Sequence, residues 1–223
     1  RNLFRDAQMD VSSAGEKVRK LIEEHLHATG VDPKIPPIEL FAGDFKEKLR
    51  DRKSPKSQAS EIEHAIKHHI SVNAEEDPIY YEQLSERLER IIQQQQDKWE
   101  DLVQLLLDLR DNIESDRVQE AEDRGLSETE NSFYNILMEA ISDQADVAEI
   151  TESTDERVTE LVRSLVVMIE EATAIVDFFD KQSEVSRVRR DIRRAVLDEP
   201  FGTTELVQRI TDQFMRLAEV KFK

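Results

Sequence analysis

Apolar residues recur along most of this chain at intervals of three and four, which is the period of an amphipathic α-helix. The widest apolar stripe predicts a central helix from Thr154 to Asp180, with Leu165 in the middle of the stripe. The same spacing predicts a short helix over residues 44–52, a helix beginning near Ser60 and a last helix after Gly202. The pattern therefore predicts helices in succession, and it predicts no strand.

Helix-end signals divide this periodic sequence into segments. Ser13 with Glu16, and Ser127 with Glu130, have the spacing of a capping box, in which two side chains satisfy free backbone N–H groups at a helix start. Glycine favours the position after a helix, so helices are predicted to end near Gly30 and Gly125.

The other boundaries depend on single residues. Asp77 followed by Pro78 predicts that a new helix starts there, since aspartate caps N–H groups and proline fits the first helical position. Residues 78–123 could form one helix or two, because their apolar phase never breaks, although Gln95 interrupts the apolar positions. We favour a break at Gln95; residues 97–100 are then a capping box, whereas in one continuous helix they are surface residues.

These segments predict an all-α fold, a bundle of about eight to ten helices in a single domain over residues 1–223. Residues 1–12 are predicted to be a linker from upstream domains, since the chain begins without methionine, as a piece of a longer protein would. Residues 31–43 contain three prolines and are predicted to be an extended connection.

Composition adds three expectations. The chain of 223 residues carries a formal net charge of −18, which should oppose general binding to phosphate backbones. It has no cysteine, which favours a cytoplasmic setting and excludes disulfide and thiol chemistry. No apolar run is long enough for a membrane span, so no membrane contact is expected.

Histidines and glutamates form two Glu-x-x-His pairs, Glu24/His27 and Glu61/His64. Di-iron helical bundles point such pairs inward, but here the helical period turns both pairs away from the apolar faces. Glu61, His64 and His68 share a polar stripe, which is more consistent with solvent or a protein partner than with a metal ion. His69 lies on the apolar side and is expected to be a core histidine with satisfied hydrogen bonds.

One segment is strongly basic. It is predicted to be a helix from Ser183 to Leu197 and contains five arginines: Arg187, Arg189, Arg190, Arg193 and Arg194. Arginine matches carboxylates and phosphates through paired N–H donors. The cluster could neutralise acidic helices of this same chain, bind a protein partner or contact nucleic acid. Arg187, Arg190 and Arg194, together with the Glu61/His64/His68 stripe, are the candidate partner-binding residues.

Three phrases of the sequence carry a family resemblance: DPKIPPI (32–38), SEIEHAIKHHI (60–70) and DPIYYEQLSERLE (77–89). They resemble the C-terminal helical region of type I restriction enzyme R subunits, and the match is best between residues 16 and 109. The basic segment SRVRRDIRRAVLD is a looser match, and residues 201–223 are looser still. These phrases are not catalytic signatures.

The resemblance implies a parent subunit with a nuclease and two motor domains, which is an ATP-dependent DNA translocase and endonuclease that uses ATP and Mg²⁺. It implies that this region docks the motor onto the methyltransferase core, with the methyltransferase subunit and the upstream motor domains as partners. None of the motor or nuclease motifs lies in this chain, and no phosphate-binding loop occurs in it. No catalytic residue and no cofactor is therefore expected in it, and its binding to nucleic acid should be weak or absent.

Three other functions stay open. The chain could be a free-standing helical protein-interaction adaptor without catalytic activity, a metal-dependent helical enzyme, or a nucleic-acid binder that acts through the arginine-rich helix.

Overall fold

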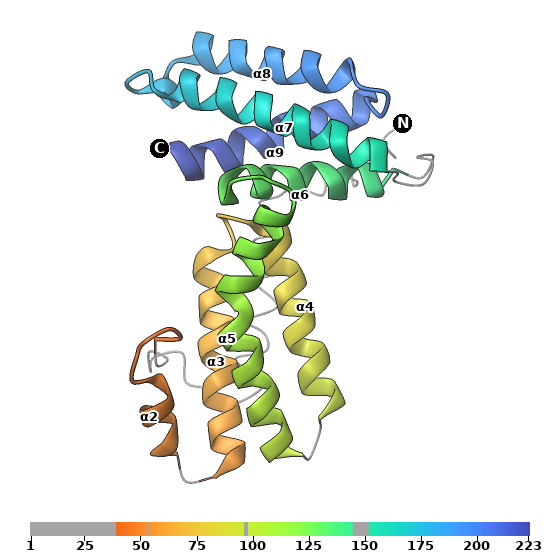
Figure 1. Ribbon diagram of the computed structural model, residues 1–223. Helices are drawn as coiled ribbons and strands as arrows, with labels where there is room; N and C mark the ends of the chain where they lie inside the picture. The colour runs from red at the N-terminus through yellow and green to blue at the C-terminus, as the bar shows by residue number, and fades with distance from the viewer. Residues whose placement is uncertain (1–38, 53, 96–97, 145–151) are drawn as a thin grey trace, which may run out of the picture. The chain divides into compact units, whose positions relative to one another are not determined.

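The computed structural model describes residues 39–52, 54–95, 98–144 and 152–223. Within these residues the chain forms eight α-helices, one short 3-10 helix and no strand (Figure 1). The all-α class predicted from the sequence is thus confirmed. None of the described helices is both long and apolar enough to cross a membrane.

The described residues fall into two compact units, each with an apolar core of its own. Residues 39–74 and 80–117 make the amino-terminal unit, and residues 75–79 and 118–223 make the carboxy-terminal unit. The single domain expected from the sequence stays a prediction, within which these are two compact units. The helical period shows which face of a helix is buried, but it does not show which helices bury their faces together.

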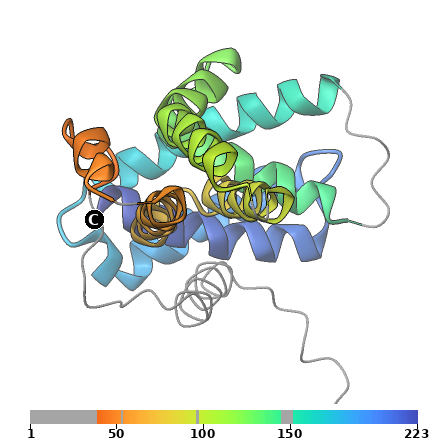
Figure 2. The same ribbon diagram turned by 90° about the horizontal axis from the view of Figure 1, so that it is seen from below.

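The amino-terminal unit is built from α2 (Phe45–Arg50), α3 (Pro55–Asn73), α4 (Pro78–Gln94) and the first part of α5 (Trp99–Asp123). The three longer helices lie side by side, with α2 beside α3 (Figures 1 and 2). Their apolar stripes meet in one core, whose fully buried members include Phe45, Ile62, Ile66, Ile70, Leu88 and Leu106.

Arg110 holds the segment before α2 against α5. Its Nε donates to the carbonyl oxygen of Leu40 at 2.8 Å, and its guanidinium lies 4.8 Å from the ring centre of Phe45. A cation over an aromatic face is attracted by the ring quadrupole. The predicted extended connection over 31–43 is described only from residue 39 onward, where the chain forms turns.

Two helix boundaries in this unit differ in how well they were predicted. The helix expected near Ser60 starts earlier, at Pro55, because Ser54 caps it by accepting a hydrogen bond from the backbone N–H of Ser57 at 3.2 Å. The break favoured at Gln95 is confirmed, since α4 ends at Gln94 and α5 begins at Trp99. The capping box suggested over 97–100 includes residue 97, which lies outside the described residues, as do the predicted helix start at Ser13 and helix end near Gly30.

The carboxy-terminal unit contains α6 (Glu128–Ser142), α7 (Glu152–Thr173), the 3-10 helix η1 (Phe178–Asp180), α8 (Gln182–Leu197) and α9 (Thr204–Phe222). Helix α6 packs on α7 and α9, and α8 packs on the same two helices (Figure 1). Phe133 and Phe214 meet edge to face in the core, with ring centres 4.9 Å apart. This is a favourable arrangement for two aromatic rings.

The predicted signals around residue 125 are confirmed. Helix α5 ends at Asp123, and Gly125 adopts a left-handed conformation with φ of 64°. Ser127 and Glu130 then form a complete capping box at the start of α6, with the Ser127 N–H donating to the Glu130 carboxylate at 2.7 Å.

The predicted central helix from Thr154 to Asp180 is wrong at its far end. Helix α7 stops at Thr173, and the chain turns through Asp177, which has φ of 55°. Val176 is 76% exposed, and Phe178 is buried in η1. The apolar spacing continues through these residues, but a turn followed by a 3-10 helix buries them differently. Leu165 lies in the core of this unit, as expected for a residue in the middle of the stripe.

The short connection between α3 and α4 belongs to the carboxy-terminal unit, although both helices lie mainly in the other one. Ile79 is part of the carboxy-terminal core, and the fully buried Asp77 accepts a hydrogen bond from the Ser132 hydroxyl at 2.9 Å. The chain therefore enters the carboxy-terminal unit at residue 75, leaves it at residue 80 and re-enters it within α5.

Candidate functional site

The predicted basic helix is present as α8, and its inner side is apolar. Val188, Ile192 and Val196 are buried in the core of the carboxy-terminal unit. Because a helix turns about 100° per residue, four of the five arginines fall on the opposite side. We call them the arginine face; they are Arg187, Arg190, Arg193 and Arg194, and all four are exposed.

The arginines of α8 differ in their partners. Arg187 pairs with Glu184 of the same helix at 2.8 Å, and the half-buried Arg189 pairs with Asp212 of α9. Arg190, Arg193 and Arg194 make no ion pair with any residue that the structure describes. The idea that the cluster neutralises this chain's own acids therefore accounts for Arg187 and Arg189, and it leaves three guanidinium groups open to a partner.

Burial lowers the pKa of Arg189, and the neighbouring positive charge of Arg193 lowers it further. An arginine still remains charged at neutral pH. Arg189 thus stabilises the packing of α8 on α9, whereas the arginine face projects outward.

Leu197 completes this surface and was not among the predicted candidate residues. It lies in the last turn of α8 and is 54% exposed. At 100° per residue it falls within about 20° of Arg190 on the helix circumference, so an apolar side chain ends the arginine face on the same side of the helix. The same helical geometry, applied to the sequence, would have found it.

The structure divides the predicted Glu61/His64/His68 stripe. His68 is exposed, but His64 is buried, and Glu61 pairs with Arg52 at 2.6 Å. Burial is the main cause of a lowered pKa at His64, with Glu61 opposing the shift. The expectation of a solvated stripe is therefore wrong for His64, because a helix face that looks polar in sequence can still be covered. A role of the three residues in binding a partner stays a prediction.

His69 is half-buried and has polar neighbours, as expected for a core histidine. The Asn73 side-chain amide lies 3.1 Å from its Nδ1, and the Tyr81 hydroxyl lies 3.5 Å from its Nε2. The ring also contacts Phe41 edge to face. Glu24 and His27 lie outside the described residues. Among the residues that are described, no group of three or more histidine, aspartate or glutamate side chains is placed to hold a metal ion.

A second polar cluster joins α6 to the first turn of α7. The Tyr134 hydroxyl donates to the Asp155 carboxylate, and the Arg124 guanidinium lies 4.6 Å from the Tyr134 ring centre. Burial raises the pKa of Tyr134, and its hydrogen bond to Asp155 raises it further. Arg124 also donates to Glu120 and Asn131 at 2.8 Å each. With its donors and acceptors joined to one another, this cluster stabilises the packing of the helix ends.

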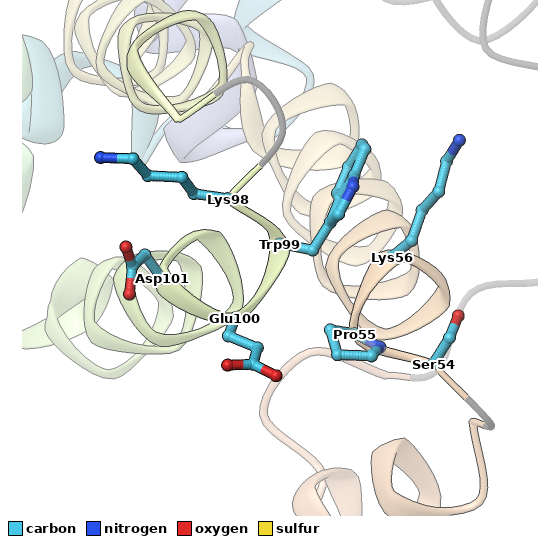
Figure 3. A pocket seen from close by; sticks show the side chains of 7 residues that line it. All are labelled: Ser54, Pro55, Lys56, Lys98, Trp99, Glu100 and Asp101. Carbon is cyan, nitrogen blue, oxygen red and sulfur yellow. The ribbon is translucent and has the colours of Figure 1, made fainter.

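A cavity of about 470 Å³ lies in the amino-terminal unit, where the starts of α3 and α5 come together (Figure 3). Lys56 reaches over the ring of Trp99, with its Nζ 5.1 Å from the ring centre. The Ser54 hydroxyl caps α3, so it is already engaged. Two lysines and two acidic residues balance each other in charge around this cavity; its lining residues are Ser54, Pro55, Lys56, Lys98, Trp99, Glu100 and Asp101.

Comparison with known proteins gives one match. The family model described as "Type I restriction enzyme HindI endonuclease subunit-like, C-terminal" matches residues 6–223. No curated protein matches the chain, and no solved structure matches it.

Proposed function

The chain belongs to the family of C-terminal regions of type I restriction enzyme HindI endonuclease subunit-like proteins, and from this premise we propose that it is an assembly module. In this role it docks the motor and endonuclease subunit onto the methyltransferase core. The parent subunit is then an ATP-dependent DNA translocase and endonuclease, and this module joins it to the part of the complex that holds the methyltransferase.

The observation that carries this proposal is the arginine face. In a chain with a net charge of −18, three exposed arginines on one helix make no ion pair with the described residues. Exposed arginines without partners suit an interface, where arginine is enriched and binds carboxylates with two parallel hydrogen bonds.

We further propose that the module itself neither hydrolyses ATP nor cuts DNA. Its sequence contains no G-x-x-x-x-G-K-S/T loop for nucleotide phosphates. DNA-stimulated ATP hydrolysis and the cleavage of plasmid DNA, both measured on the pure chain with Mg²⁺, test this proposal. Either activity in the pure chain would refute it.

Docking can be tested with the chain itself. The purified chain, shown to be helical by circular dichroism, is added to the purified methyltransferase core, and the complex is followed by sedimentation velocity. We expect a complex, and we expect the chain to compete with the full endonuclease subunit for the core. If the folded chain neither binds nor competes, it is not the docking module.

A further inference from the structure

The chemistry of the α8 surface narrows the kind of partner that fits it. Arg190, Arg193 and Arg194 are exposed without an ion pair among the described residues, and the 54% exposed Leu197 follows them on the same side of the helix. From Arg190 to Leu197 the helix rises about 10 Å, at about 1.5 Å per residue. The surface is therefore a narrow strip two turns long, with positive charge along most of its length and an apolar side chain at its carboxy-terminal end.

Guanidinium groups bind both carboxylates and phosphates, so the arginines alone do not choose between a protein and a nucleic acid. Two other features favour a protein. The net charge of −18 repels a polyphosphate chain at long range. An exposed leucine also gains nothing against a phosphate backbone, whereas arginines together with apolar contact area are typical of protein interfaces.

We infer that the arginine face together with Leu197 binds an acidic amphipathic helix on the methyltransferase core. A partner helix has the same rise per turn as α8, so carboxylates three or four residues apart can face successive arginines. An apolar residue about one turn beyond those carboxylates would then cover Leu197. This inference rests on the proposed docking function, and it names the surface and the chemistry of the partner.

The test measures association of the full endonuclease subunit with the methyltransferase core by sedimentation velocity, at low and at physiological salt. Arg190→Glu with Arg194→Glu should weaken association about tenfold or more, since like charges now face each other. Arg190→Lys with Arg194→Lys keeps the charge but loses the paired donors, so it should cause a smaller loss. The matched control is Arg50→Glu with Arg90→Glu, which makes the same change in net charge at two exposed positions of α2 and α4.

Leu197 provides an independent arm. Leu197→Asp should weaken association, because it places a carboxylate against the partner's carboxylates and removes the apolar contact. Leu197→Met should bind like the unaltered protein, because methionine keeps the apolar volume. Circular dichroism checks the fold of each variant. If the double glutamate variant fails to fold, the double lysine variant and Leu197→Asp decide.

The outcomes separate this inference from the docking function. If the unaltered chain binds the core and all the α8 variants bind equally well, docking stands and this surface is not the dock. If the arginine control loses as much affinity as the α8 variant, general repulsion explains the effect and the inference fails. If the chain binds random duplex DNA below micromolar concentration with a steep salt dependence, and the double glutamate variant abolishes this, the surface binds phosphate instead.

Discussion

Replacement of Leu165 by aspartate tests whether α7 organises the core of the carboxy-terminal unit. Leu165 is 3% exposed and is surrounded by the apolar residues of that core. The substitution removes a buried aliphatic side chain and puts a carboxyl group in its place. Val167, two residues further along the same helix and 52% exposed, provides a matched control.

The expected effect has two parts. Truncation alone, as in Leu165→Ala, should lower the free energy of unfolding by about 2–5 kcal/mol, the usual loss for a buried leucine. The carboxyl of Leu165→Asp adds the cost of burying a polar group without a partner. Because whole domains are stable by only about 5–15 kcal/mol, the aspartate variant should lose a large part of this unit's stability and unfold at a much lower urea concentration.

The pH dependence of the Leu165→Asp stability shows how much of the loss comes from the buried carboxyl. An apolar core raises the pKa of a buried carboxyl above its usual value of about 3.9. The unfolded state therefore ionises first, and the stability deficit relative to Leu165→Ala grows as the pH rises above about 3.9, until the pH passes the folded-state pKa. The deficit should thus be larger near about pH 7 than near about pH 5.

Urea unfolding followed by far-UV circular dichroism measures these differences for Leu165→Ala, Leu165→Asp and Val167→Asp. The control should change the stability by no more than about 0.5 kcal/mol, as surface substitutions usually do. A Leu165→Asp variant with the same urea midpoint as the Val167→Asp control would show that α7 does not organise this core.

Four further tests concern other parts of the fold. Ile66→Ala should destabilise the amino-terminal core by about 2–5 kcal/mol. Val72→Ala, on the exposed side of α3, should be close to neutral. Unfolding of this unit can be followed by the fluorescence of Trp99, the only tryptophan. Ser127→Ala should cost about 0.5–2 kcal/mol through loss of the cap, and no shift in thermal melting would exclude that role. Gly125→Ala should cost about 1–2 kcal/mol, since an L-residue is strained at positive φ, and Gly125→Asn should cost less. His64 has a lowered pKa when folded, so the unfolded state binds the proton first and stability should fall as the pH drops below 6.5. His64→Gln should reduce that fall. A variant with an unchanged pH profile of stability would contradict this role of His64.

Local signals in the sequence predicted local structure well. Gly125 and the Ser127–Glu130 capping box fixed the boundary between α5 and α6, because the hydrogen bonds involved join residues only a few positions apart. The capping signal of Ser54 with Pro55 was equally readable in the sequence, and it gives the true start of α3. The end of α7 was missed, because Ile175 and Phe179 keep the apolar period through a turn.

Features that depend on tertiary packing could not be predicted in this way. The arginine-rich helix was found from the sequence, and the Arg187–Glu184 pair follows from its spacing of three residues. The Arg189–Asp212 pair joins α8 to α9, so only the fold reveals it. The fold likewise shows which arginines of α8 are paired and which are not. The burial of His64 likewise depends on what covers α3, which the pattern of a single helix does not contain.

The path of the chain through the α3–α4 connection limits how this region can be divided. Residues 75–79 contribute to a core made mostly by residues after 117. No single cut of the chain therefore gives two continuous pieces that each contain one complete unit. A truncation after residue 117 would retain Asp77 but lose the Ser132 hydroxyl that binds it. It would also leave Ile79 without the apolar residues that surround it. Domain exchange between related subunits should therefore avoid a boundary between residues 79 and 118, since such a boundary would separate a buried carboxylate from its hydrogen-bond donor.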